Sequence, residues 1–85
     1  MFISTNPYTL EILAEFQPLT TSKLNRKLEN SARAFSYWKS QTLDFRLSIL
    51  ENLARQIETD VEFLSVAMGE EMGKTITEAR AEVLK

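Results

Sequence analysis

The 85-residue sequence contains no cysteine and no histidine. Without cysteine the chain cannot form a disulfide, and it has no thiol nucleophile. Together the two absences remove the usual zinc ligands and the commonest general base.

Long apolar runs and a strong excess of one charge are also missing. The apolar runs are a few residues long, whereas a membrane-spanning helix needs about 20. The first residues, "MFISTNPYTL", lack the basic start and apolar stretch of a secretory signal. The net charge of −2 gives no electrostatic footprint for nucleic acid. We expect a cytoplasmic location, with neither nucleic acid nor membrane as a partner.

The composition itself is that of a folded chain. Hydrophobic residues make up 44% and charged residues 26%, which suits a soluble globular protein. A chain of this length forms one domain at most, and it buries so little surface that its stability is marginal.

Residues 2–16 predict a β-hairpin. Asn6-Pro7 is a turn dipeptide, because proline fixes φ and asparagine bonds to nearby backbone. Apolar residues precede and follow this turn. An isolated two-stranded hairpin is barely stable in water, so this one needs a surface to lie on.

Four helices are expected after the hairpin, near residues 20–39, 43–57, 60–72 and 76–85. Thr20 or Thr21 can cap the first helix, and Thr42 can cap the second. The apolar faces of these two helices recur at helical spacing. They comprise Leu24, Leu28, Phe35 and Trp38 in the first, and Leu43, Leu47, Leu50, Ala54 and Ile57 in the second.

Helix boundaries are also predicted in the second half of the chain. Thr59 and Glu62 have the spacing of a capping box, which favours a break there. One kinked helix over 43–72 is the alternative. Gly73 predicts a helix stop, and Thr75 with Glu78 repeats the box. The last helix begins with a cap and has no terminating signal, so we expect the natural chain to continue.

Several stretches resemble a known family. "STNPYTLEILAEF", "AFSYWKSQTLDFRLSIL" and "EEMGKTITEARAEV" resemble, in order, the N-terminal segment of the NAD(P)-dependent aldehyde dehydrogenases. The shared features include the Asn-Pro turn, the Tyr37-Trp38 pair and Arg46. The "MGK" and "EARAEV" stretches are most similar to the succinate-semialdehyde dehydrogenase branch. Two positions depart from the pattern: Leu10 replaces a glycine, which weakens the hairpin, and Thr75 harmlessly replaces a proline.

The resemblance implies a parent oxidoreductase that oxidises an aldehyde to a carboxylate with NAD or NADP. Residues 1–85 are then a mainly α piece with an N-terminal hairpin, taken from the Rossmann-type cofactor domain of an α/β enzyme. The catalytic domain, and most of the cofactor domain, lie outside it. The resemblance places the catalytic and cofactor-binding residues in later parts of such chains, so we assign no catalytic, cofactor-binding or metal-binding residue to residues 1–85. We expect this piece to be inactive, to bind no cofactor, and to pack on the rest of an oligomeric parent or self-associate.

Individual stretches also suggest other functions. "GKT" at 73–75 lacks the earlier glycine of a phosphate-binding loop, since position 68 is methionine. The remaining candidates fit solvated or packing surfaces better than a metal, nucleic-acid or base-stacking site. They are the acidic Glu70, Glu71, Glu78 and Glu82, the basic Lys23, Arg26 and Lys27, the aromatic Phe35, Tyr37 and Trp38, and the apolar Met68 and Met72. A complete small helical interaction module is the alternative function.

Overall fold

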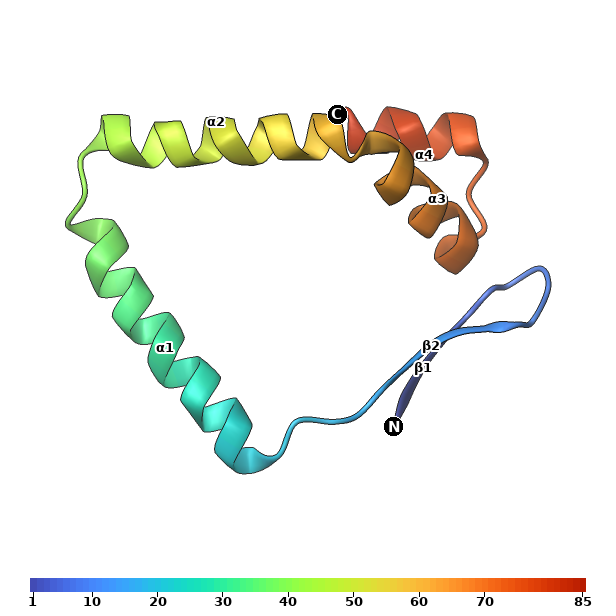
Figure 1. The fold of residues 1–85 in the computed structure, drawn as a ribbon, viewed down its shortest axis with the longest axis horizontal. Coiled ribbons are helices and arrows are strands. Elements are labelled where there is room, and N and C mark those ends of the chain that lie inside the picture. Colours follow the sequence, from blue (N-terminus) through green and yellow to red (C-terminus); the bar gives the residue numbers. More distant parts are fainter. The chain divides into compact units, whose positions relative to one another are not determined.

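The computed structural model describes residues 1–85 as two strands followed by four helices (Figure 1). The chain divides into two compact units, one made of residues 1–17 and 53–85 and the other of residues 18–52. The mainly helical fold with an N-terminal hairpin is as predicted. None of the helices is long and apolar enough to cross a membrane.

The first unit begins with the predicted hairpin. Strands β1 (Phe2–Thr5) and β2 (Ile12–Phe16) pair in antiparallel fashion, with Phe2 opposite Phe16 and Ser4 opposite Ala14. The register shifts after Ser4, which indicates a bulge. Ser4 and Ala14 are half-buried, whereas the large apolar side chains of both strands are exposed.

The loop between the strands is held by Asn6. Its side-chain oxygen accepts hydrogen bonds from the amides of Tyr8 and Thr9, and its carbonyl accepts one from the Leu10 amide. Leu10 has a φ of +63°, the conformation for which glycine is favoured. The hairpin therefore forms even though Leu10 adopts a backbone conformation that is strained for a residue with a side chain.

The second unit contains helix α1 (Thr21–Lys39) and the beginning of α2 (Leu43–Thr59). The Thr20 hydroxyl caps α1 by accepting from the Lys23 amide, and the Thr42 hydroxyl accepts from the Phe45 amide. The rings of Tyr37 and Phe45 meet edge to face, with centroids 6.4 Å apart. No residue of α1 is buried.

The start of helix α3 (Val61–Met72) differs from the prediction in which residue occupies the cap position. Thr59 does not cap it, because its hydroxyl donates to the carbonyl of Arg55 within α2. Asp60 occupies the cap position without a side-chain cap hydrogen bond. The chain does break at Asp60 as proposed, so a single kinked helix over 43–72 is wrong, and so is the Thr59 capping box.

The end of α3 and the start of α4 (Ile76–Val83) agree with the predicted signals. Gly73 has a φ of +73° and its amide bonds to the Gly69 carbonyl, which is a left-handed helix stop. The Thr75 hydroxyl then accepts from the Glu78 amide. Helices α3 and α4 pack against each other. Ser65 of α3 and Ala79 of α4 are the two residues with no exposed surface.

Candidate functional site

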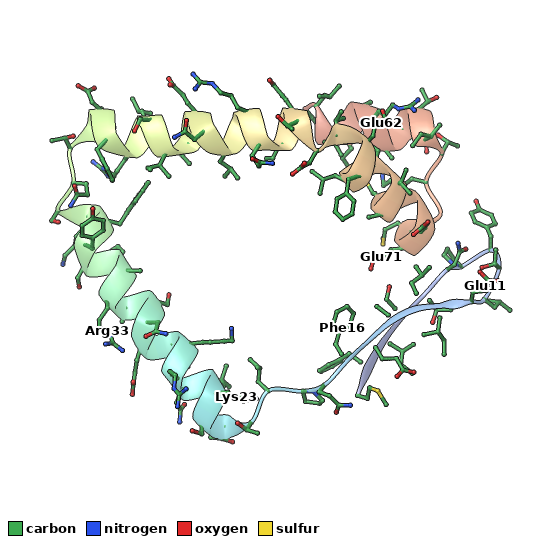
Figure 2. All side chains as sticks on the ribbon, in the orientation of Figure 1. Glu11, Phe16, Lys23, Arg33, Glu62 and Glu71 are labelled. Atoms are coloured by element: carbon green, nitrogen blue, oxygen red, sulfur yellow. The ribbon has the colours of Figure 1, made fainter.

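The hairpin is attached to the turn between α3 and α4. Ser4 Oγ donates a 2.8 Å hydrogen bond to Glu71 Oε1, and Tyr8 Oη donates one of 3.2 Å to the Gly73 carbonyl. Figure 2 shows Glu71 at the end of α3 that faces the hairpin. The surface that the hairpin needs is therefore supplied, in part, by residues nearly at the other end of the sequence.

Gly73 is required at this contact for a second reason besides its positive φ. A Cβ atom at this position would lie 2.9 Å from Tyr8 Cε2 and 3.2 Å from Pro7 Cγ. Both distances are shorter than ordinary carbon contacts. Gly73 thus lets the hairpin loop approach the turn between α3 and α4. In the "GK" stretch, this glycine serves packing.

The charged residues of α3 and α4 form two ion pairs. Arg80 donates two hydrogen bonds to Glu62, of 2.7 and 3.0 Å, and Lys74 lies 2.7 Å from Glu82. The hydrogen bonds from Arg80 lower the pKa of Glu62, and the hydrogen bond from Lys74 lowers the pKa of Glu82. Both pairs are partly exposed to solvent, and each carboxylate has a cation as its partner.

The acidic residues considered as a metal site do not converge. No three acidic side chains gather in a group that could hold a metal ion. Glu71 accepts from Ser4, and Glu82 pairs with Lys74. The open depression on α4 lined by Lys74, Glu78 and Glu82 carries charges of both signs.

The residues of this chain do not fit a dinucleotide. A Rossmann-type site requires a glycine-rich turn between a strand and a helix. The two glycines here stand within and directly after α3, and neither follows a strand. Lys74 is engaged by Glu82, and Thr75 is engaged as a helix cap. No phosphate cradle exists at this turn.

The aromatic residues near the end of α1 form no enclosed pocket. Ser31, Ala34, Phe35, Tyr37 and Trp38 line a shallow depression to which α1 alone contributes. Phe35 is 62% exposed, and Lys39 lies over its ring at 5.4 Å. The surface is a solvent-facing apolar stripe on one helix.

Arg46, near the start of α2, is one of the residues that carry the family resemblance. The residue is half-buried, and its Nε atom is inaccessible to solvent and has no hydrogen-bond partner. A buried, unpaired guanidinium nitrogen is costly, since Arg normally satisfies its donors. No local sequence signal could have revealed it.

Comparison with known proteins identifies the family to which this chain is similar. The model described as "Aldehyde dehydrogenase family" matches residues 1–85. The chain is 33% identical to the N-succinylglutamate 5-semialdehyde dehydrogenase of Pseudomonas fluorescens (strain Pf0-1), over 96% of this chain and 17% of that protein. The enzyme of the same name from Burkholderia thailandensis is 34% identical, over 98% of this chain and 17% of its own length.

The chain therefore spans about one sixth of the length of the curated relatives that it matches. No solved structure matches it significantly. The relatives are named for succinylglutamate semialdehyde, so the predicted likeness to the succinate-semialdehyde branch is not supported. From the family match over its whole length, the chain belongs to the aldehyde dehydrogenase family.

Proposed function

We propose that residues 1–85 are a scaffold segment of the cofactor domain, at the N-terminus of an NAD(P)-dependent aldehyde dehydrogenase. The observation that carries this proposal is the family match over the whole chain, combined with relatives about six times as long. The segment contributes surface and support, while the aldehyde chemistry belongs to residues outside it.

The proposed parent reaction is the oxidation of a semialdehyde to a carboxylate, with transfer of a hydride to NAD or NADP. The names of the relatives support N-succinylglutamate 5-semialdehyde as the substrate. This molecule and succinate semialdehyde are both aldehydes that carry carboxylate groups. The substrate choice is made by the remainder of the enzyme, because this chain has no enclosed pocket that could hold either.

The isolated chain is inactive and binds no cofactor on this proposal. It has no cysteine to attack an aldehyde and no glycine-rich turn at the end of a strand. Two of its acidic residues, Glu62 and Glu82, form ion pairs with Arg80 and Lys74, and no three acidic side chains converge.

The proposed partner of the exposed helical surfaces is the rest of a cytoplasmic parent enzyme. Side chains such as Leu28, Phe35 and Leu50 are more than half exposed. Covering a large apolar side chain is worth about 1.5–3 kcal/mol.

A graft tests the proposal. The matching 82-residue segment of the Pseudomonas fluorescens relative is replaced by the corresponding residues of this chain. We expect the graft to reduce NAD+ or NADP+ with N-succinylglutamate 5-semialdehyde, while the isolated chain does not. The relative itself is the positive control. Turnover by the isolated chain, or an inactive graft beside an active relative, would contradict the proposal.

A further inference from the structure

The two-stranded sheet has a free edge. Strand β2 pairs only with β1, and no backbone hydrogen bond joins residues 12–16 to any other part of the chain. Of the two strands, β1 is the one that packs on α3, which leaves β2 as the open side of the hairpin. We call the backbone N–H and C=O groups of β2 that point away from β1 the β2 edge. An edge of this kind is a template on which a further strand can pair.

The register shows which residue points its backbone groups outward. The Asn6 amide donates to the Glu11 carbonyl, so Asn6 directs its backbone groups at the opposite arm of the hairpin. Alternate residues of a strand point the same way, so Ser4 does this too, and Ile3 points away. Glu15 pairs with Ile3, and directly opposite residues share this property. The amide and carbonyl of Glu15 therefore belong to the β2 edge.

The side chains of the hairpin are apolar on both faces. Phe2, Ser4, Ala14 and Phe16 share one face by the register, and Ile3 lies on the other. Ser4 and Ala14 are half-buried, whereas Phe2, Phe16 and Ile3 are each more than half exposed. A sheet with one face in water alternates apolar and polar residues, whereas strands covered on both sides carry apolar residues on both. This hairpin has the second pattern.

Strand β2 also lacks the features that protect an open edge. Proteins block such edges with lysine, with proline or with a bulge that twists the strand away. The sequence of β2, "ILAEF", contains neither lysine nor proline, and the register shift lies at the loop end, away from Glu15. The Glu15 side chain stands on a face of the sheet, so its charge does not obstruct the edge.

A third strand has to come from outside residues 1–85. All regular structure after Phe16 is helical, so the chain itself has no strand to add. A two-stranded hairpin is marginally stable, and three or more strands with an apolar face are needed for a stable sheet. The relatives are about six times as long as this chain, so the remainder of the proposed parent offers ample further sequence.

We propose that a strand from the remainder of the parent enzyme pairs with the β2 edge and makes the hairpin part of a larger sheet, an inference that rests on the proposed function. Recognition is by backbone hydrogen bonds, with the amide and carbonyl of Glu15 as the central donor and acceptor. Phe16, next to Glu15, packs against a side chain of the added strand.

Amide hydrogen exchange at Glu15 tests this pairing. It is measured in the graft with the Pseudomonas fluorescens relative and in the dilute isolated chain. In the isolated chain the Glu15 amide faces solvent and exchanges rapidly. In the graft we expect it to exchange at least about a hundredfold more slowly, because the added strand accepts its hydrogen bond.

Two variants of the graft separate the lost amide from the lost side chain. Glu15→Pro removes the amide, and proline is tolerated in a strand where the N–H points outward. Glu15→Ala keeps the amide and is the matched control. We expect the Glu15→Pro graft to lose activity about fivefold faster on heating than the Glu15→Ala graft, because one buried backbone hydrogen bond is missing. In the isolated chain the two variants should be equally stable.

Three results would overturn the inference. Rapid exchange of the Glu15 amide in an active graft, or equal inactivation rates of the two variant grafts, would reject the added strand and leave the proposed function intact. Protection of the Glu15 amide that rises with the concentration of the isolated chain would assign the β2 edge to a second copy instead. A graft that is inactive beside an active relative would overturn the proposed function, and this inference with it.

Discussion

The phenol oxygen of Tyr8 lies 3.2 Å from the carbonyl oxygen of Gly73, although the two residues are 65 positions apart in sequence. The same ring lies so close to Gly73 that a Cβ atom there would stand 2.9 Å from Tyr8 Cε2. The hairpin loop and the α3–α4 turn are thus one packed junction, and the glycine is shared by the helix stop and the loop contact.

Gly73→Ala tests this double requirement. A left-handed alanine costs about 1–2 kcal/mol, and the contacts with Tyr8 and Pro7 add to that. We expect the free energy of unfolding to fall by about 2 kcal/mol or more in a urea titration. Gly69→Ala is the matched control, because Gly69 is inside α3, and a Cβ there meets only the Lys74 carbonyl at 3.3 Å. Equal effects of the two substitutions would contradict the account.

Leu10→Gly should stabilise the hairpin. Leu10 has a φ of +63° and is 75% exposed, so glycine relieves strain and removes little packing. Because glycine also loses more backbone entropy on folding, the net gain is about 0.5–1 kcal/mol. Thermal unfolding should show a higher Tm. A lower Tm would mean that the Leu10 side chain contributes packing that its exposure does not suggest.

Thr75→Ala and Thr59→Ala form a matched pair. Thr75 caps α4 through the Glu78 amide, so its loss should cost about 1 kcal/mol. Thr59 donates only to the Arg55 carbonyl inside α2, so its replacement should change stability by less than about 0.5 kcal/mol. The two free energies of unfolding are compared by urea titration. A larger loss of stability for Thr59→Ala than for Thr75→Ala would indicate that Thr59 caps α3, contrary to the structure.

The Glu62–Arg80 pair predicts a pH dependence. Arg80 lowers the pKa of Glu62 below its ordinary value of 4.5, so the folded chain releases this proton more easily than the unfolded chain. The stabilisation is complete above about pH 4.5 and is lost as the pH falls through the lowered folded value. Glu62→Gln should flatten this part of the profile of unfolding free energy against pH. An unchanged slope would show that the pair does not form in solution.

Local signals predicted much of this fold. Asn6 directs the hairpin loop, Gly73 ends α3, and Thr20, Thr42 and Thr75 cap helices, each through contacts within a few residues. The error at Thr59 has a physical cause as well. A threonine hydroxyl can serve the preceding turn of a helix as readily as the amides that follow it.

The contacts between distant residues could not be predicted. Ser4 with Glu71, and Arg80 with Glu62, depend on how the elements pack, and no spacing in the sequence marks them. The unpaired Arg46 Nε is likewise known only from burial. That no catalytic residue lies in this chain stays a prediction, as does the use of NAD or NADP by the parent enzyme.

Amide hydrogen exchange of α1 tests the central claim most directly, namely that its apolar stripe is made to be covered by other protein. It is measured in the graft with the Pseudomonas fluorescens relative and in the dilute isolated chain. The account predicts strong protection of residues 24–38 in the graft and rapid exchange in the isolated chain. Equal protection of α1 in both would show that the segment is complete by itself and would contradict the account.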